Sequence, residues 1–375
     1  MRRSIPLIAT ILLFAFSSTC MVFAQGPTQS AKSLAVVDPL DRPAIKSQAA
    51  PHSVLLDVTK VGNRFIAVGE RGIIVLSDDG GRSWKQADVP TSVSLAAVRF
   101  VSQKKGWVVG HSGIVLHTED GGETWSKQLD GRMVAKLAVE YAQSLVGKPG
   151  VKNADRLLAD AQRLQTDGPD KPFLAIYFED ESKGFIVGAY GLTFRTEDAG
   201  KTWKPWMDRV ENSRGMHIYA IAGSGKTIYM AGEQGLFLRS TDGGEKFTKV
   251  ETPYKGTYFT LALLPSGEIV LGGMRGNAYR SADQGKTFQP VQNPIPVSFS
   301  ATTQLGDGTR VFANQAGQLL ATNDGGKTLH PLPVQGLPPI SGIADAGNGM
   351  LMTVGFMGAI PVPLEQAAPG LGGAR

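Results

Sequence analysis

The sequence is poor in cysteine. Its 375 residues include only Cys20, and this residue lies in a segment typical of a secretory signal peptide. Arg2 and Arg3 form a basic start, residues 5–16 an apolar run, and Val22-Phe23-Ala24 a small-residue cleavage site. We therefore expect a signal peptide over 1–24, which leaves an exported chain without cysteine for disulfides, thiolate chemistry or metal binding.

Two other interpretations of this segment stay open. A lipid anchor at Cys20 would make the chain a lipoprotein, but Thr19 stands before the cysteine where Gly or Ala is usual. Arg2-Arg3 lacks the downstream pattern of a twin-arginine signal. We favour a periplasmic or extracellular protein with an N-terminal extension over 25–40.

The sequence also has little excess of positive over negative charge. The formal net charge is +5 and falls to +3 when the two arginines of the signal peptide are removed. This small excess does not imply nucleic acid as a partner. No other apolar run is long enough to cross a bilayer, so membrane association after cleavage would depend on a partner or a surface.

Glycine, in contrast, is abundant, and much of it belongs to a repeat. The pattern Ser/Thr-x-Asp-x-Gly-x-Thr-aromatic, relaxed at its edges, recurs six times with start-to-start spacings of 41, 78, 44, 41 and 41 residues. The copies span 77–84, 118–125, 196–203, 240–247, 281–288 and 322–329. A unit of about 41 residues with several short strands is the period of a β-propeller blade.

The strand pattern predicts the number of blades. In the second unit, strands are expected over 96–101, 107–110, 114–117 and 125–129, with the repeat between the third and the fourth. Three further strands follow the sixth repeat, and the segment 41–49 is a candidate for the missing fourth. We therefore predict an all-β, seven-bladed propeller of four-stranded antiparallel blades over 41–365, followed by a flexible tail over 366–375.

The spacing of 78 residues indicates an insertion. Over 131–170 the strand pattern stops, and Val134, Leu137, Ala138, Tyr141 and Leu145 take helical spacing. A second helix is expected to start after Asn153, as its N-cap, and to end before the sequence Asp-Gly-Pro. The prediction is an inserted helical hairpin, which could be a neutral embellishment, because long surface insertions cost little stability.

We interpret the repeats as structural. Each aspartate can accept backbone N–H groups of its turn, and the closing aromatic can pack between sheets. Because the copies lie in separate blades, the aspartates cannot converge on one substrate. The residues assigned this structural role are Asp79, Asp120, Asp198, Asp242, Asp283, Asp324, Trp84, Trp125 and Trp203.

The candidate binding surface lies on the opposite face. In a propeller, the turns between second and third strands share one face with the connections from each blade to the next, so the hairpin should overhang this face. The predicted turns mix Arg, Tyr, His, Phe and Met, a composition typical of protein-binding surfaces. The predicted partner-binding residues are Arg71, His111, Tyr190, Glu233, Arg275 and Phe356.

No catalytic constellation is evident. The five histidines have no paired metal spacing, and the Gly-Lys-Thr runs lack the context of a phosphate-binding loop. A sialidase would need three converging arginines near a tyrosine and a glutamate, and Arg71, Arg275, Tyr190 and Glu233 could share a face without any spacing that fixes them together. We predict no catalytic residue, no metal site and no cofactor.

The repeat looks like that of bacterial neuraminidases. Together with the short blades and the Val/Ala-Gly-x-x-Gly segment before each repeat, it resembles the photosystem II stability/assembly factor family of propellers over about 54–364. The resemblance implies an exported, non-enzymatic assembly factor that binds a membrane protein or envelope complex, and we expect a monomer. The alternative is a carbohydrate-active propeller, either a sialidase-like glycosidase or a lectin.

Overall fold

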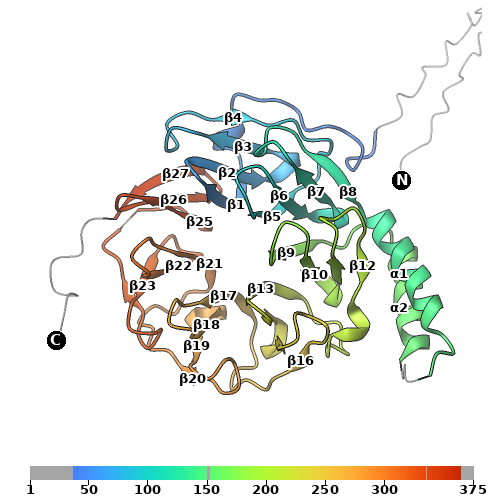
Figure 1. The fold of residues 1–375 in the computed structure, drawn as a ribbon. Coiled ribbons are helices and arrows are strands. Elements are labelled where there is room, and N and C mark those ends of the chain that lie inside the picture. Colours follow the sequence, from blue (N-terminus) through green and yellow to red (C-terminus); the bar gives the residue numbers. More distant parts are fainter. Residues whose placement is uncertain (1–36, 150–152, 335, 365–375) are drawn as a thin grey trace, which may run out of the picture. The chain divides into compact units, whose positions relative to one another are not determined.

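Seven antiparallel sheets follow one another around a ring in the computed structural model, which describes residues 37–149, 153–334 and 336–364 (Figure 1). Six sheets have four strands and the seventh has three. The prediction of a seven-bladed propeller with a helical insertion is confirmed. The predicted signal peptide and the C-terminal tail lie outside the described residues.

Each blade is a meander in which neighbouring strands are consecutive in sequence. Blade 1 contains β1 (Leu55–Val61), β2 (Arg64–Gly69), β3 (Ile74–Ser77) and β4 (Lys85–Gln86). Blade 2 contains β5 (Leu95–Phe100), β6 (Gly106–Gly110), β7 (Val115–Thr118) and β8 (Ser126–Leu129). Blade 3 contains β9 (Phe173–Phe178), β10 (Gly184–Gly188), β11 (Thr193–Thr196) and β12 (Lys204–Pro205).

The remaining blades complete the ring. Blade 4 contains β13 (Ile218–Ser224), β14 (Thr227–Gly232), β15 (Phe237–Ser240) and β16 (Thr248–Lys249). Blade 5 contains β17 (Tyr258–Leu263), β18 (Ile269–Gly273), β19 (Ala278–Ser281) and β20 (Gln289–Pro290). Blade 6 contains β21 (Phe299–Gln304), β22 (Arg310–Asn314), β23 (Leu319–Thr322) and β24 (His330–Pro331), and blade 7 contains β25 (Ile340–Gly347), β26 (Met350–Gly355) and β27 (Gly358–Pro363).

The core lies between the blades. The second strands β6 and β10 are buried along their whole length, because a sheet on each side covers both of their faces, and they are correspondingly apolar throughout. The closing tryptophans Trp125 and Trp203 are 6% and 4% exposed and pack into the clusters that join blade 1 to blade 2 and blade 2 to blade 3. Burial of such large apolar side chains stabilises the contacts between these blades.

The predicted fourth strand of blade 7 does not form. Residues 41–49 contain no strand and instead run along blade 1, where Ala44 donates to the carbonyl of Val89 at 3.0 Å and Ser47 to the side chain of Gln86 at 2.8 Å. β27 contains Pro361 and Pro363, and proline has no N–H to offer a neighbouring strand. The ring closes by packing of β1 against β25 and of the short helix η1 (Ala50–His52) against β27.

The insertion forms the predicted hairpin of helices α1 (Gly131–Leu145) and α2 (Ala154–Asp167). Asp130 caps α1 by accepting hydrogen bonds from the N–H groups of Arg132 and Met133, whereas Asn153 is the N-cap residue of α2 but makes no such bond with its side chain. The small side chains of Ala138, Ala142 and Ala161 are buried in the cluster that joins the two helices.

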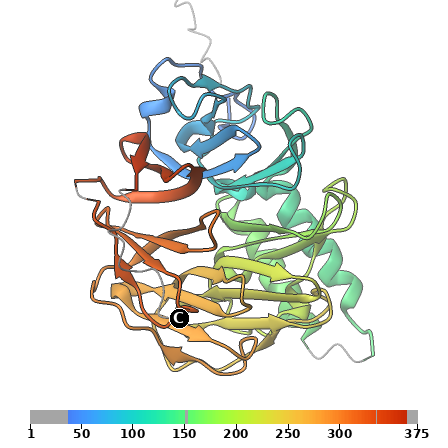
Figure 2. The ribbon, with the colours of Figure 1, turned by 60° about the vertical axis from the view of Figure 1, so that its left-hand side comes forward.

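The position of the hairpin differs from the prediction. It stands outside the ring beside β12 (Figures 1 and 2), where Tyr141 of α1 donates to Asp208 at 3.0 Å. Met207 and apolar side chains of both helices form one cluster. The apolar faces of the two helices therefore pack against each other and against the outer side of blade 3. It therefore does not cover the centre of either face.

Candidate functional site

The six repeats lie between third and fourth strands and use their aspartates within their own turns. In every copy, the Ser or Thr at the first position donates to the aspartate two residues later at 2.6–2.9 Å. Asp79 also accepts from the N–H groups of Arg82 and Ser83 at 3.0 and 2.9 Å. Hydrogen bonds from Ser83 hold the pKa of Asp79 well below its ordinary value. We call this side of the ring the box face.

The opposite side, which we call the turn face, consists of the turns between second and third strands and the connections between blades. Five of these turns are short 3₁₀ segments: η2 (Glu70–Gly72), η3 (His111–Gly113), η4 (Ala189–Gly191), η6 (Glu233–Gly235) and η7 (Met274–Gly276). Their central residues include Arg71, Tyr190 and Arg275, with φ of 54°, 56° and 56°. Left-handed φ costs such residues on the order of 1 kcal/mol each, and strained backbone of this kind clusters at functional sites.

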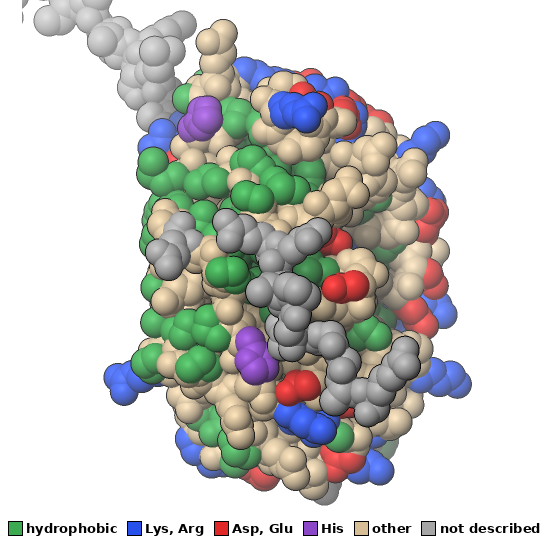
Figure 3. All heavy atoms as spheres, turned by 90° about the vertical axis from the view of Figure 1, so that its left-hand side faces the viewer, with side chains coloured by type: hydrophobic (Ala, Val, Ile, Leu, Met, Phe, Trp, Pro, Cys, Tyr) green, Lys and Arg blue, Asp and Glu red, His purple; other side chains and the backbone are tan. Residues whose placement is uncertain are grey.

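Exposed hydrophobic side chains gather on the turn face. Eight large ones are exposed among the described residues, and four belong to these turns: Tyr190, Met274, Phe356 and Met357, at 61%, 40%, 64% and 64% exposure. Figure 3 views the ring from the side of blades 6 and 7, with hydrophobic side chains along the left-hand edge and most charged ones toward the right. The four stand on turns of blades 3, 5 and 7, which makes this face a candidate for interaction with a partner.

One sector of the turn face is almost free of charge. The described segments of blades 5–7 on this face, 291–298, 314–318, 332–334, 336–339 and 355–358, contain no Asp, Glu, Lys or Arg. Exposed Arg275 stands at the border of this sector, next to Met274. Depletion of charge together with Phe, Met and Arg is the composition of the buried centre of protein interfaces.

A second group of side chains lies where blades 3, 4 and 5 meet. The ring of Tyr190 lies 5.0 Å from that of His217, His217 lies 6.2 Å from Tyr219, and Tyr219 lies 5.3 Å from Phe259, measured between centroids. Glu233 accepts a hydrogen bond from the N–H of His217 at 2.8 Å. We call Tyr190, His217, Tyr219 and Phe259 the aromatic strip.

A β-bulge that recurs in every blade positions two rings of the strip, those of Tyr219 and Phe259. Each innermost strand carries one extra residue, the second of the strand, relative to its partner. A bulge re-aims the side chain of the extra residue. The seven residues are half-buried and run around the ring as Leu56, Ala96, Leu174, Tyr219, Phe259, Ser300 and Ser341, so only blades 4 and 5 place aromatic rings here.

The base of the hairpin supports the same region. A Cβ at Gly113 in the turn of blade 2 would lie 2.7 Å from the Cα of Gly131 at the start of α1. Beyond α2, the ammonium of Lys171 lies 5.3 Å from the centroid of the Tyr190 ring and pairs with Asp170 at 2.5 Å and Asp167 at 3.4 Å. The hairpin therefore fixes one border of the aromatic strip without covering it.

The predicted partner-binding residues divide into two groups. Tyr190 and Glu233 are brought together through His217, whereas Arg71, His111, Arg275 and Phe356 stand on turns of blades 1, 2, 5 and 7. Within the described part of the chain, the guanidinium groups of Arg71 and Arg275 make no hydrogen bond or ion pair. Arg71, Arg275 and Tyr190 stand on the turns of three different blades, 1, 5 and 3.

Sequence reasoning missed His217, Tyr219, Phe259 and Lys171. Alignment of the repeats on their first strands would have shown an aromatic residue at the second position in two successive blades. Burial, and then the charge of Glu233, raise the pKa of Tyr219, which keeps its hydroxyl protonated.

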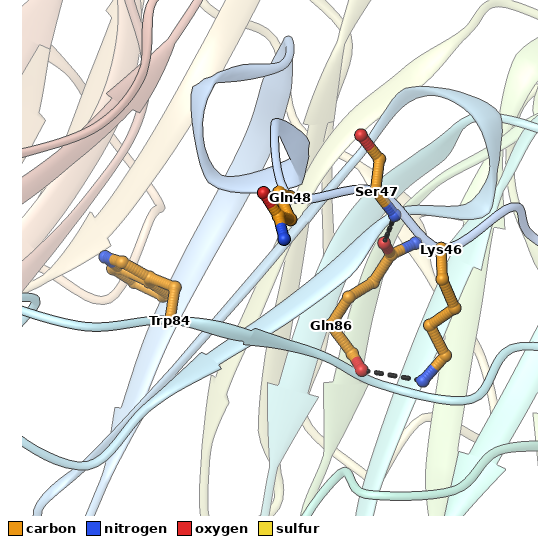
Figure 4. A pocket seen from close by; sticks show the side chains of 5 residues that line it. All are labelled: Lys46, Ser47, Gln48, Trp84 and Gln86. Atoms are coloured by element: carbon orange, nitrogen blue, oxygen red, sulfur yellow. Dashed lines mark hydrogen bonds between the residues drawn. The ribbon is translucent and has the colours of Figure 1, made fainter.

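A pocket on blade 1 lies elsewhere. It is lined by Lys46, Ser47, Gln48, Trp84 and Gln86, where the N-terminal segment crosses the blade (Figure 4). Lys46 donates to the carbonyl of Gln86 and pairs with Asp88, both at 2.9 Å. Its ammonium group therefore already has an acidic partner within the protein. No group of three His, Cys, Asp or Glu side chains that could hold a metal ion occurs in the described ranges. Over the same residues, no helix is long and apolar enough to span a membrane.

The fold and this face define the chain as a β-propeller with a turn-built face that carries exposed hydrophobic side chains. Residues 45–138 and 159–330 match the family described as photosynthesis system II assembly factor YCF48. The chain belongs to this family, which confirms the resemblance found in the repeats. The unmatched stretch 139–158 covers the second half of α1 and the start of α2.

Individual relatives are distant. The photosystem II assembly lipoprotein Ycf48 of Synechococcus sp. (strain CC9902) is 31% identical over 77 residues, which is 20% of this chain and 23% of that protein. A structure of YCF48 bound to D1 peptide has a TM-score of 0.60 at 18% identity and covers 86% of this chain and 99% of its own. YCF48 from Cyanidioschyzon merolae has a TM-score of 0.58 at 16% identity and covers 84% of this chain and 96% of its own.

The same fold also occurs in an enzyme. A streptogramin B lyase structure has a TM-score of 0.63 at 14% identity and covers 84% of this chain and 95% of its own. At such identities the likeness establishes the fold alone, and function has to be argued from the site.

Proposed function

We propose that this chain is a non-enzymatic scaffold that binds an extramembrane segment of a membrane protein on its turn face and assists the assembly of that protein. The observation that carries the proposal is the exposure of Tyr190, Met274, Phe356 and Met357 on this face. Membership of the assembly-factor family supports it. The predicted export would place the scaffold, as a monomer, in the periplasm or outside the cell.

The charge-free sector supports a protein partner. Its exposed apolar side chains can be desolvated without removing an unpaired carboxylate or ammonium group from water. Arg275 at the border can pair with an acidic group of the partner. A YCF48 structure with a bound D1 peptide is a precedent for a peptide partner on this fold.

The runner-up function is that of a carbohydrate-active propeller. Tyr190 lies close to Glu233 through His217, which is one part of a sialidase-like arrangement. Arg71 and Arg275 stand on blades 1 and 5 and do not complete it. We therefore favour the scaffold and propose that no reaction is catalysed on this face.

Site-specific photo-crosslinking tests the proposal. A benzoylphenylalanine is placed at Phe356 or at Tyr190 on the turn face, and at exposed Lys201 on the box face as the matched control. With solubilised membranes of the source cell, the two turn-face positions should crosslink the same membrane protein and Lys201 should not. Equal crosslinking from Lys201, or none from Phe356 and Tyr190, would overturn the proposal.

A further inference from the structure

The aromatic strip is a row of four rings where blades 3, 4 and 5 meet. Successive rings of Tyr190, His217, Tyr219 and Phe259 meet edge to face, at interplanar angles of 63°, 65° and 65°. In such a row the edge of one ring packs against part of the face of the next, and no two rings stack face to face. Tyr190 is 61% exposed and the other three side chains are half-buried, so part of the ring surface along the strip is open to a ligand.

Two charged residues beside the strip have partners within the protein. Lys171 pairs with Asp170 and Asp167, and the carboxylate of Glu233 accepts from the N–H of His217 and lies 3.6 Å from its Nδ1. Lys171 therefore offers no free ammonium group to a carboxylate of the occupant, and the charge of Glu233 repels one. These two residues disfavour an acidic occupant of the strip.

The backbone beside the strip also limits the occupant. Tyr219 and Phe259 are the bulged residues of β13 and β17 and interrupt the regular register there. A bound strand needs a regular ladder of backbone N–H and C=O groups, whereas a polyproline II segment has no such requirement and docks on aromatic side chains.

We propose that the aromatic strip binds a proline-containing, extended segment of the partner protein by stacking of its pyrrolidine rings on Tyr190, Tyr219 and Phe259. The inference rests on the proposed scaffold function and names the chemistry of the segment that the turn face recognises. A polyproline II chain advances about 3.1 Å per residue, so roughly six residues cover the four rings.

Binding of a defined peptide tests the inference. The probe is a fluorescein-labelled, blocked decaproline, compared with a labelled decapeptide of alternating Gly and Ser, and affinity is measured by fluorescence anisotropy with the purified protein. Decaproline should bind more tightly than the Gly-Ser peptide. Tyr219→Leu and Phe259→Leu keep apolar volume but remove the flat ring, and each should weaken decaproline binding about threefold to tenfold.

Phe288→Leu is the matched control, because Phe288 is a half-buried aromatic residue that closes the fifth repeat on the box face, away from the strip. The affinity of this variant for decaproline should stay at the wild-type value, and thermal unfolding checks that all variants are folded. Decaproline binding no tighter than that of the Gly-Ser peptide, or an equal loss in Phe288→Leu, would overturn the inference. So would binding of chitotetraose that the two strip variants abolish, since this would assign the strip to sugars.

The two proposals fail separately. Crosslinking of one membrane protein from Phe356 and Tyr190 without decaproline binding would leave the scaffold function standing and remove the strip as a proline site. Loss of both would remove both proposals.

Discussion

The Oδ2 of Asp57 accepts a hydrogen bond from the backbone N–H of Val98 at 2.9 Å, which joins the innermost strands of blades 1 and 2. Its Oδ1 accepts from the N–H of Val58 at 2.8 Å. Burial is the largest influence on this carboxyl and raises its pKa to about 6, against the lowering effect of the two hydrogen bonds.

This carboxyl should make the ring more stable at mildly acidic pH. Because the folded-state pKa lies above the unfolded value of 3.8, the folded protein binds the proton more tightly between these values. Its contribution to stability is therefore full below about pH 4 and is lost as the pH rises through 6, by about 3 kcal/mol.

Asp57→Asn should remove this dependence, because an amide oxygen can still accept from Val98 and carries no charge. Urea unfolding at pH 4, 5, 6 and 7 measures the free energy of unfolding of both proteins, and the difference between them isolates Asp57 from other groups. A difference that does not change between pH 4 and 7 would contradict the assignment.

His117 should act in the opposite direction. Its ring stacks on Trp107 at 4.7 Å, and burial lowers its pKa below the ordinary 6.5. The unfolded chain then takes up the proton first, so the stabilisation is full above pH 6.5 and declines as the pH falls below it. His117→Phe keeps the stacking, and its thermal unfolding temperature should fall less than that of the wild type between pH 7.5 and 5.5. A parallel fall in both proteins would show that His117 does not titrate in this window.

The aspartates of the repeats should differ in their contribution to stability. Asp120 accepts from the hydroxyls of Thr118 and Thr124 and from the N–H of Thr124, whereas Asp242 accepts from Ser240 and from the N–H of Lys246 only. Asp120→Ala should lower the free energy of unfolding by about 1–3 kcal/mol, and Asp242→Ala by less. Denaturant unfolding of the two variants checks the order, and an equal or reversed order would contradict this account.

The repeats predict most of the fold because each copy fixes a local turn. The spacing of Asp79, Asp120 and their counterparts sets the blade length, and the interruption after Leu129 locates the hairpin. Ring closure could not be predicted in the same way. The strand pattern of 41–49 is weak, and whether it pairs with β27 depends on Pro361 and Pro363, which remove N–H groups from that strand.

The candidate site is predictable only in part, for a related reason. Tyr190 and Glu233 belong to repeated turns and could be placed on one face from the sequence. His217 comes from the connection before blade 4 and reaches both residues only in the folded ring. Tyr219 and Phe259 are the extra residues of a β-bulge. All seven blades share this bulge, but no residue pattern within one blade predicts it.

Arg71 should be a residue kept for binding rather than for stability. It has φ 54° in the turn of blade 1, where Asn is better tolerated than Arg. Arg71→Asn should leave the free energy of unfolding unchanged or raise it by up to about 1 kcal/mol, and should lower the yield of the membrane protein crosslinked from Phe356. Unchanged crosslinking would exclude Arg71 from the contact surface, and a loss of stability would show that its side chain supports the fold.

The outer edge of blade 7 should be protected from other strands by its prolines. Within 37–364, the range that contains the described residues, no fourth strand lies beside β27, and its ladder with β26 is intact over six residue pairs. Pro361 and Pro363 are two residues apart, so their missing N–H groups fall on the same edge of β27. Because the ladder with β26 is intact, that edge is the outer one.

The double substitution Pro361→Thr and Pro363→Thr would restore two backbone N–H donors at this edge, in residues that favour β-structure. We expect this variant to dimerise or aggregate at concentrations where the wild type is monomeric, as measured by size-exclusion chromatography with light scattering. The matched variant Pro294→Thr and Pro296→Thr, in the connection before blade 6, should stay monomeric, because it adds donors where no strand edge exists. Monomers in both variants would show that proline does not protect this edge.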